Sequence, residues 1–293
     1  MQKIIPHLWF DKEAKVASEL YTSLFTDSAI TNINTITGTP SGDCDIVNFS
    51  LAGQEFMAIS AGPYFKLNPS ISLFVTFDTE VEIKAVWDKL VDGGKVLMEY
   101  NSYPWATKYG WLQDKYGLSW QLSMSEHHQM GQKITPMLMF TQDKAGKAQE
   151  AIQMYTSLFT DSKTEMLVPY EKGEGDVEGY IKHARFTLAG ENFMAMDSSA
   201  AHEFTFNEAL SFIVTCDTQE EIDMYWEKLS FVPEAEQCGW CKDAYGVSWQ
   251  IVPTAMNEMM SKGTKEQIAR VTQAFLQMKK FDIKKLDEAY NKD

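Results

Sequence analysis

The stretch YTSLFTDS occurs twice, from Tyr21 to Ser28 and again, letter for letter, from Tyr155 to Ser162. Eight identical residues at so great a separation do not arise by chance. The chain therefore consists of two copies of one domain, and any proposed function has to fit a duplicated scaffold.

The repeated octet is interpreted as the end of a helix and the turn that follows it. Apolar side chains fall on one helical face at Ala17, Leu20, Tyr21, Leu24 and Phe25. Asp11 stands where a helix cap is expected, and Thr-Asp-Ser is typical of a turn. The identity of the octet thus indicates packing and turn geometry and not chemistry.

The rest of copy one predicts a strand–helix–three-strand unit (βαβββ) that occurs twice. The predicted elements are a strand at 3–10, the helix at 11–25, strands at 30–37 and 46–60 with a hairpin at Ala52-Gly53, a strand at 71–77, a helix capped by Thr79, and strands near 95–98, 105–112 and 118–123. Copy two repeats this order, but ten residues are missing before Trp240.

These patterns predict an α+β protein with four segments. The expected domain 1 covers 1–124, a polar linker covers 125–132, domain 2 covers 133–253, and a helical extension covers 254–293. Thr264 and Asp282 are expected to cap two amphipathic helices in this tail. Their apolar faces should pack on the body of the protein or on a partner subunit.

Composition limits the partners. The net charge of −15 argues against nucleic acid and against anionic membranes, because both are bound by basic patches. No apolar run is long enough to span a membrane, and the N-terminal residues lack the pattern of a signal peptide. We therefore expect a cytoplasmic protein.

Four cysteines are too few for a disulfide scaffold of this size. Cys238 and Cys241 have the CxxC spacing of a redox pair or of half a zinc site. The matching positions in copy one are Tyr109 and Leu112, and no second CxxC supplies further ligands. We interpret the cysteines as incidental thiols in a reducing compartment.

Several motifs resemble a known family. PHLWFD, YTSLFTDS, FSLAGQEFMAI, SLFVTFDTEVEI and GWLQDKYGLSWQL look like those of the PhnB-like proteins, whose domain carries the name 3-demethylubiquinone-9 3-methyltransferase. That family belongs to the vicinal oxygen chelate superfamily of glyoxalases, bleomycin-resistance proteins and extradiol dioxygenases. The tail at 270–290 also looks like an extension common in the family. The resemblance implies two tandem glyoxalase-like domains, and it leaves the reaction undefined.

The resemblance also implies where a metal would be held. Metal enzymes of the superfamily bind a divalent ion through His and Glu residues on sheet strands. The corresponding positions here are Gln121 and Gln250 on the closing strands, Ser72 and Ser211 before the second helices, and His7 and Met137 on the first strands. An amide is a weaker ligand than a carboxylate for a hard cation. Neither copy shows three good ligands, so we expect no metal and no cofactor.

A sheet of this fold curves around a cavity, which is the default ligand site. The candidate pocket residues are His7, Trp9, Tyr64, Ser72, Trp111 and Gln121, with Ser211, Trp240 and Gln250 in copy two. Trp120 and Gln121 are adjacent on a strand and point to opposite faces, so the amide is assigned to the cavity. His7 is a hypothetical general base without an obvious orienting carboxylate. His127, His128, His183 and His202 are interpreted as surface or structural residues.

Four functions remain open at this point. The first is a metal-free protein that binds or turns over a small, partly apolar molecule. The second is a metal-dependent lyase, isomerase or dioxygenase. The third is the methyltransferase of the family name, although the chain has no GxGxxG-like turn and no alternating parallel βα pattern. The fourth is a structural module. The two copies are expected to pair within one chain, each completing the other's cavity, and pairing of two chains is left open.

Overall fold

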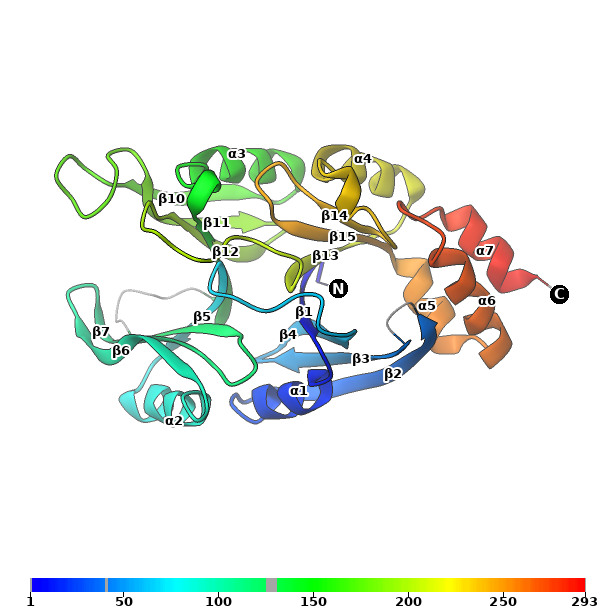
Figure 1. Ribbon diagram of the computed structural model, residues 1–293, viewed down its shortest axis with the longest axis horizontal. Coiled ribbons are helices and arrows are strands. Elements are labelled where there is room, and N and C mark those ends of the chain that lie inside the picture. Colours follow the sequence, from blue (N-terminus) through cyan, green and yellow to red (C-terminus); the bar gives the residue numbers. More distant parts are fainter. Residues whose placement is uncertain (1, 40–41, 125–130, 293) are drawn as a thin grey trace.

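The computed structural model describes residues 2–39, 42–124 and 131–292 (Figure 1). Residues 125–130, which make up most of the predicted linker and include His127 and His128, lie outside them.

Copy one contains two strand–helix–three-strand modules in its described residues. Its elements are β1 (Ile4–Phe10), α1 (Ala14–Thr22), β2 (Ala29–Thr39), β3 (Gly42–Leu51), β4 (Gln54–Ser60), β5 (Ile71–Phe77), α2 (Glu80–Leu90), β6 (Lys95–Tyr103), β7 (Ala106–Gln113) and β8 (Ser119–Met124). The predicted order is confirmed. Helix α1 begins later than predicted, with Glu13 and not Asp11 at its N-cap and no side-chain cap.

Copy two repeats the first module, but its second module is shorter. Its elements are β9 (Ile134–Phe140), η1 (Gln142–Lys144), α3 (Ala148–Leu158), β10 (Lys163–Pro169), β11 (Ile181–Leu188), β12 (Glu191–Asp197), β13 (Leu210–Cys216), α4 (Gln219–Leu229), η2 (Pro233–Ala235), β14 (Trp240–Lys242) and β15 (Ser248–Pro253). The ten missing residues remove the counterpart of β6. Within 210–253, which are all described, two strands follow α4.

Each sheet combines strands from both copies. In the described residues one sheet has the order β14-β15-β13-β1-β4-β3-β2, and the other has the order β10-β11-β12-β9-β5-β8-β7-β6. The joints are antiparallel pairs between β1 and β13 and between β5 and β9. The two copies therefore pair within one chain.

Helices α1 to α4 cover the outer faces of the curved sheets, with α1 and α2 along one side of the molecule and α3 and α4 along the other (Figure 1). The core under them contains the fully buried rings of Trp120 and Trp249. Each indole donates a hydrogen bond to the aspartate of the preceding turn, Asp114 at 2.9 Å and Asp243 at 2.8 Å. Burial raises the pKa of both carboxyl groups.

The repeated octet ends as a turn that holds the Ala-Gly hairpin. Asp27 has a φ of 53°, and its carbonyl accepts a hydrogen bond from the Gly53 N–H at 2.8 Å. The Ser28 hydroxyl accepts from the Ala52 N–H, also at 2.8 Å. The same contacts recur in copy two, from Gly190 to Asp161 and from Ala189 to Ser162. The octet thus joins each helix to its hairpin.

The tail packs on the body of the same chain. It forms α5 (Thr254–Lys262), which was not predicted, α6 (Lys265–Phe275) and α7 (Ile283–Asn291). The predicted caps Thr264 and Asp282 are confirmed. The apolar sides of the helices contact Ile36 on β2 and Val252 on β15. No helix in the described ranges has the length and apolar character needed to cross a membrane.

Candidate functional site

The candidate sites are the inner faces of the two sheets, opposite the helices. We call the inner face of the sheet that contains β1 face A, and that of the sheet that contains β5 face B. Because directly opposed residues of neighbouring strands share a face, the strand register shows which side chains meet.

The register brings most of the predicted pocket residues into two matched rows. On face A, His7 lies opposite Met57 on one side and Ser211 on the other, and Gln250 lies opposite Trp240. The corresponding row on face B is Met137 opposite Met194 and Ser72, and Gln121 opposite Trp111. Each row contains residues of both copies.

Face A holds a short polar chain under aromatic rings. The Gln250 amide Nε2 donates to Ser211 Oγ at 3.0 Å, and Ser211 Oγ lies 3.5 Å from His7 Nδ1. The His7 ring meets the Trp240 ring edge-on, with 5.3 Å between their centroids. Burial lowers the pKa of His7 to about 3. The imidazole is therefore neutral near pH 7 and a weak general base.

Face B holds a different chain at the same place. The Tyr109 hydroxyl donates to Gln121 Oε1 at 2.8 Å, and Gln121 Nε2 donates to Ser72 Oγ at 2.7 Å. Trp111 Nε1 donates to Ser119 Oγ at 2.8 Å. Burial raises the pKa of Tyr109, so its hydroxyl stays protonated. From the sequence we had considered Tyr109 only as the counterpart of Cys238, although strand alternation places it on the face of Trp111.

Two predicted residues, Trp9 and Tyr64, lie outside the rows. Trp9 contacts Phe65, with 5.1 Å between ring centroids, and its Nε1 donates to the Gly62 carbonyl at 2.8 Å. Trp9 also lies 6.0 Å from Trp240, centroid to centroid. Tyr64 is 66% exposed, and it is not brought to the rows. Its neighbour Phe65 is the residue that contacts Trp9.

The donors on these faces do not fit a divalent cation. No cluster of three or more His, Cys, Asp or Glu residues arranged for a metal occurs in the described part of the chain. Both ends of the Gln121 amide are already engaged by Tyr109 and Ser72. The row on face A offers one imidazole and no carboxylate. A metal held by the superfamily's positions would therefore lack anionic ligands.

The cysteine pair is not assembled as a reactive site. All four cysteines lie in the described residues and are free thiols. Cys241 is buried, and burial raises the pKa of its thiol as well as that of Cys238. A raised thiol pKa disfavours the thiolate that redox chemistry and metal binding require.

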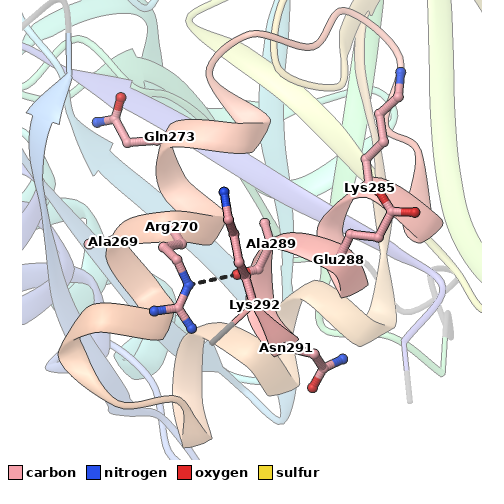
Figure 2. A pocket seen from close by; sticks show the side chains of 8 residues that line it. All are labelled: Ala269, Arg270, Gln273, Lys285, Glu288, Ala289, Asn291 and Lys292. Carbon is pink, nitrogen blue, oxygen red and sulfur yellow. Dashed lines mark hydrogen bonds between the residues drawn. The ribbon is translucent and has the colours of Figure 1, made fainter.

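A surface hollow lies away from both faces, between α6 and α7 of the tail. Figure 2 shows its lining, which is Ala269, Arg270, Gln273, Lys285, Glu288, Ala289, Asn291 and Lys292. The Arg270 guanidinium donates to the carbonyls of Ala289, at 2.9 Å, and Tyr290, at 3.1 Å. None of the predicted pocket residues lines this hollow.

Comparisons with known proteins agree with this architecture. A family described as 3-demethylubiquinone-9 3-methyltransferase matches residues 2–123 and again 132–252. A PhnB protein of Bacillus cereus that carries the same methyltransferase name is 42% identical over 42% of this chain and 100% of its own, with a TM-score of 0.40. A protein from Staphylococcus aureus is 35% identical over 43% of this chain and 98% of its own, with a TM-score of 0.19.

The fold extends to a longer solved structure. Glyoxalase I from Zea mays covers 85% of this chain and 91% of its own, with 10% identity and a TM-score of 0.54. At this identity the likeness shows the fold alone. The search of curated proteins found no match.

Proposed function

The chain belongs to the family described as 3-demethylubiquinone-9 3-methyltransferase, and on that premise we propose that it binds a small, partly apolar molecule on the inner faces of its sheets. We place the protein in the cytoplasm and its two domains at 1–124 and 133–253. The two stretches that match the family support these domain bounds.

The observation that carries the proposal is a buried amide at the same place in both copies. Gln121 is 6% exposed and Gln250 is 7% exposed, and each donates to a buried serine. Burying an amide costs free energy that hydrogen bonds only offset, so a face that served packing alone would favour apolar side chains. A few polar groups in an apolar, aromatic wall are typical of a ligand site.

The tryptophans beside these amides are accessible to a ligand. Trp111 and Trp240 are both partly exposed, whereas Trp120 and Trp249 on the opposite side of the sheets are buried. An indole with one buried side and one accessible side can contact an apolar ligand at low entropic cost. The matched pair therefore marks the rim of each face.

The proposal is tested with a neutral fluorescent probe, N-phenyl-1-naphthylamine. We expect saturable binding to the whole protein, weakened several-fold by Trp111→Ala or Trp240→Ala and more by both together. Val81→Ala, which shortens an exposed side chain on α2, is the matched control and should not alter binding. Absence of saturable binding, or binding that survives the double substitution, would contradict the proposal.

The other functions suggested by the sequence find less support. The donor set of the faces lacks the carboxylates of a divalent metal site, as described above. The methyltransferase name implies S-adenosylmethionine, but in the described sheets the parallel pairs, such as β1–β4 and β5–β8, are separated by antiparallel neighbours. That order differs from the parallel βα sheet that a common class of methyltransferases uses. Calorimetry with S-adenosylmethionine is the direct check.

A further inference from the structure

The side chain of Arg185 places a positive charge on face B. It lies on β11, directly opposite Met166 of β10 and Met194 of β12. Its sequence neighbours Ala184 and Phe186 are buried in the core under the helices. Because side chains alternate along a strand, Arg185 projects from the other side of the sheet.

The surroundings of Arg185 connect it to the row described above. Met194, which faces it across the strands, packs in one cluster with Met137, Tyr109 and Phe74. Tyr109 donates to Gln121, and Met137 lies opposite Ser72 on the neighbouring strand. The guanidinium and the polar chain of face B therefore share one apolar wall.

The Arg185 side chain has no partner among the described residues. It is half-buried, its Nε is buried without a hydrogen bond, and no carboxylate pairs with the guanidinium although the protein has a net charge of −15. Cations removed from water are normally paired, because desolvation is costly. The chain contains one other arginine, Arg270, and its guanidinium donates hydrogen bonds to two backbone carbonyls.

Packing of the strand does not require this cation. The matching residue of copy one is Asn48 on β3, which lies between Asn32 and Met57 as Arg185 lies between Met166 and Met194. A neutral amide thus occupies the same position in the same kind of sheet. At this position, face B carries a positive charge and face A does not.

We propose that face B binds an amphipathic organic anion, with its acidic head on Arg185 and its apolar body against Met137, Met194 and Tyr109. This rests on the proposed function and names its ligand class. The planar guanidinium fork matches carboxylate, sulfonate or phosphate oxygens. Methionines adapt to varied apolar shapes. Arg185 and Ser72 are three strands apart, about 14 Å between backbones, which suits a body of two fused rings.

Two probes that differ only in charge test the inference. 8-Anilino-1-naphthalenesulfonate has the rings of N-phenyl-1-naphthylamine and adds an anionic group. Arg185→Asn, which copies Asn48, should weaken binding of the sulfonate about tenfold and leave the neutral probe unchanged. Excess 1-naphthoate should displace the sulfonate from the unaltered protein, whereas the same concentration of acetate should not.

The outcomes separate the two proposals. If Arg185→Asn binds the sulfonate as well as the unaltered protein does, the anion site is wrong and the binding function stands. If neither probe binds, both are wrong. If Arg185→Asn loses both probes equally, Arg185→Lys decides, because it keeps the charge. Retention of the preference for the sulfonate by that variant supports the inference, and its loss overturns the inference.

Discussion

Faces A and B are built on one plan and differ at a few positions of their rows. Both keep the buried glutamine, the serine that accepts its hydrogen bond, and a partly exposed tryptophan. Face A carries the neutral His7 where face B has Met137. Face B carries Arg185 where face A has Asn48. The duplication has thus kept the polar frame and changed the charge, so the two faces should prefer different ligands.

The edges of the two sheets also differ. Face B ends in β6, which pairs with β7. Face A lacks that strand and ends at β14. The turn before β14 is held by the tail, because the Cys238 N–H donates to the Met278 carbonyl at 2.8 Å and the Gly239 N–H to the Lys279 carbonyl at 2.7 Å. Phe281 packs so closely on Gly239 that a methyl group there would lie 2.5 Å from the ring. The tail therefore supports the turn that leads into the edge strand β14.

The largest effect should come from removing this edge contact. Phe281 is 2% exposed, so Phe281→Ala should lower the free energy of unfolding by about 3–5 kcal/mol through lost burial and a cavity. Urea denaturation measures the change. Phe231→Ala, at a phenylalanine that is 70% exposed, is the control and should change it by less than about 1 kcal/mol. Equal effects of the two substitutions would show that the tail does not support this edge of the sheet.

The second comparison uses pH and the histidine of face A. Burial lowers the pKa of His7 to about 3, below its ordinary value of 6.5. The unfolded chain therefore binds a proton below pH 6.5 that the folded protein rejects, and stability falls as the pH drops from 6.5 toward 3. His7→Met, which copies Met137, should remove about 3 kcal/mol of this loss by pH 4.

Urea denaturation of the unaltered protein and of His7→Met, at pH 7 and at pH 4, isolates the contribution of His7 to stability. Asp114 and Asp243 have raised pKa values and act in the opposite direction, but both proteins contain them. The difference between the unfolding free energies of the two proteins therefore changes with pH only through His7. If the difference in unfolding free energy between the two proteins is the same at pH 7 and pH 4, His7 is not buried as a neutral ring.

The smallest expected effect concerns the charge of face B. In the absence of ligand, Arg185→Met should raise the free energy of unfolding by about 1 kcal/mol, because it removes a half-buried cation that has no partner. Arg270→Met should lower it, since that guanidinium binds two carbonyls. Thermal unfolding of the two variants checks the opposite signs. A loss of stability in Arg185→Met would show that the cation already has a partner.

Much of this arrangement could be predicted from the sequence. The repeat established the duplication, and hydrophobic periodicity gave the order of strands and helices. Strand alternation assigned Gln121 to the inner face, and the matching of the copies did the same for Gln250. These inferences depend on local spacing, which the chain carries directly.

The rest depends on contacts between distant segments. His7 and Ser211 come together only because β1 pairs with β13, from the other copy. Arg185 could not be identified from the sequence, because only the folded structure shows that its side chain has no partner among the described residues. The contact between the tail and the turn before β14 likewise required the structure. Asp11 was wrongly assigned as a cap because the helix begins after Glu13.

A crystal structure of the protein with 1-naphthoate tests the central claim most directly. The account predicts one molecule on face B, with its carboxylate within hydrogen-bond distance of the Arg185 guanidinium and its rings against Met137 and Met194. In Arg185→Asn crystals prepared alike, that molecule should be absent. Naphthoate bound in the hollow between α6 and α7, with face B filled by its own side chains, would contradict it.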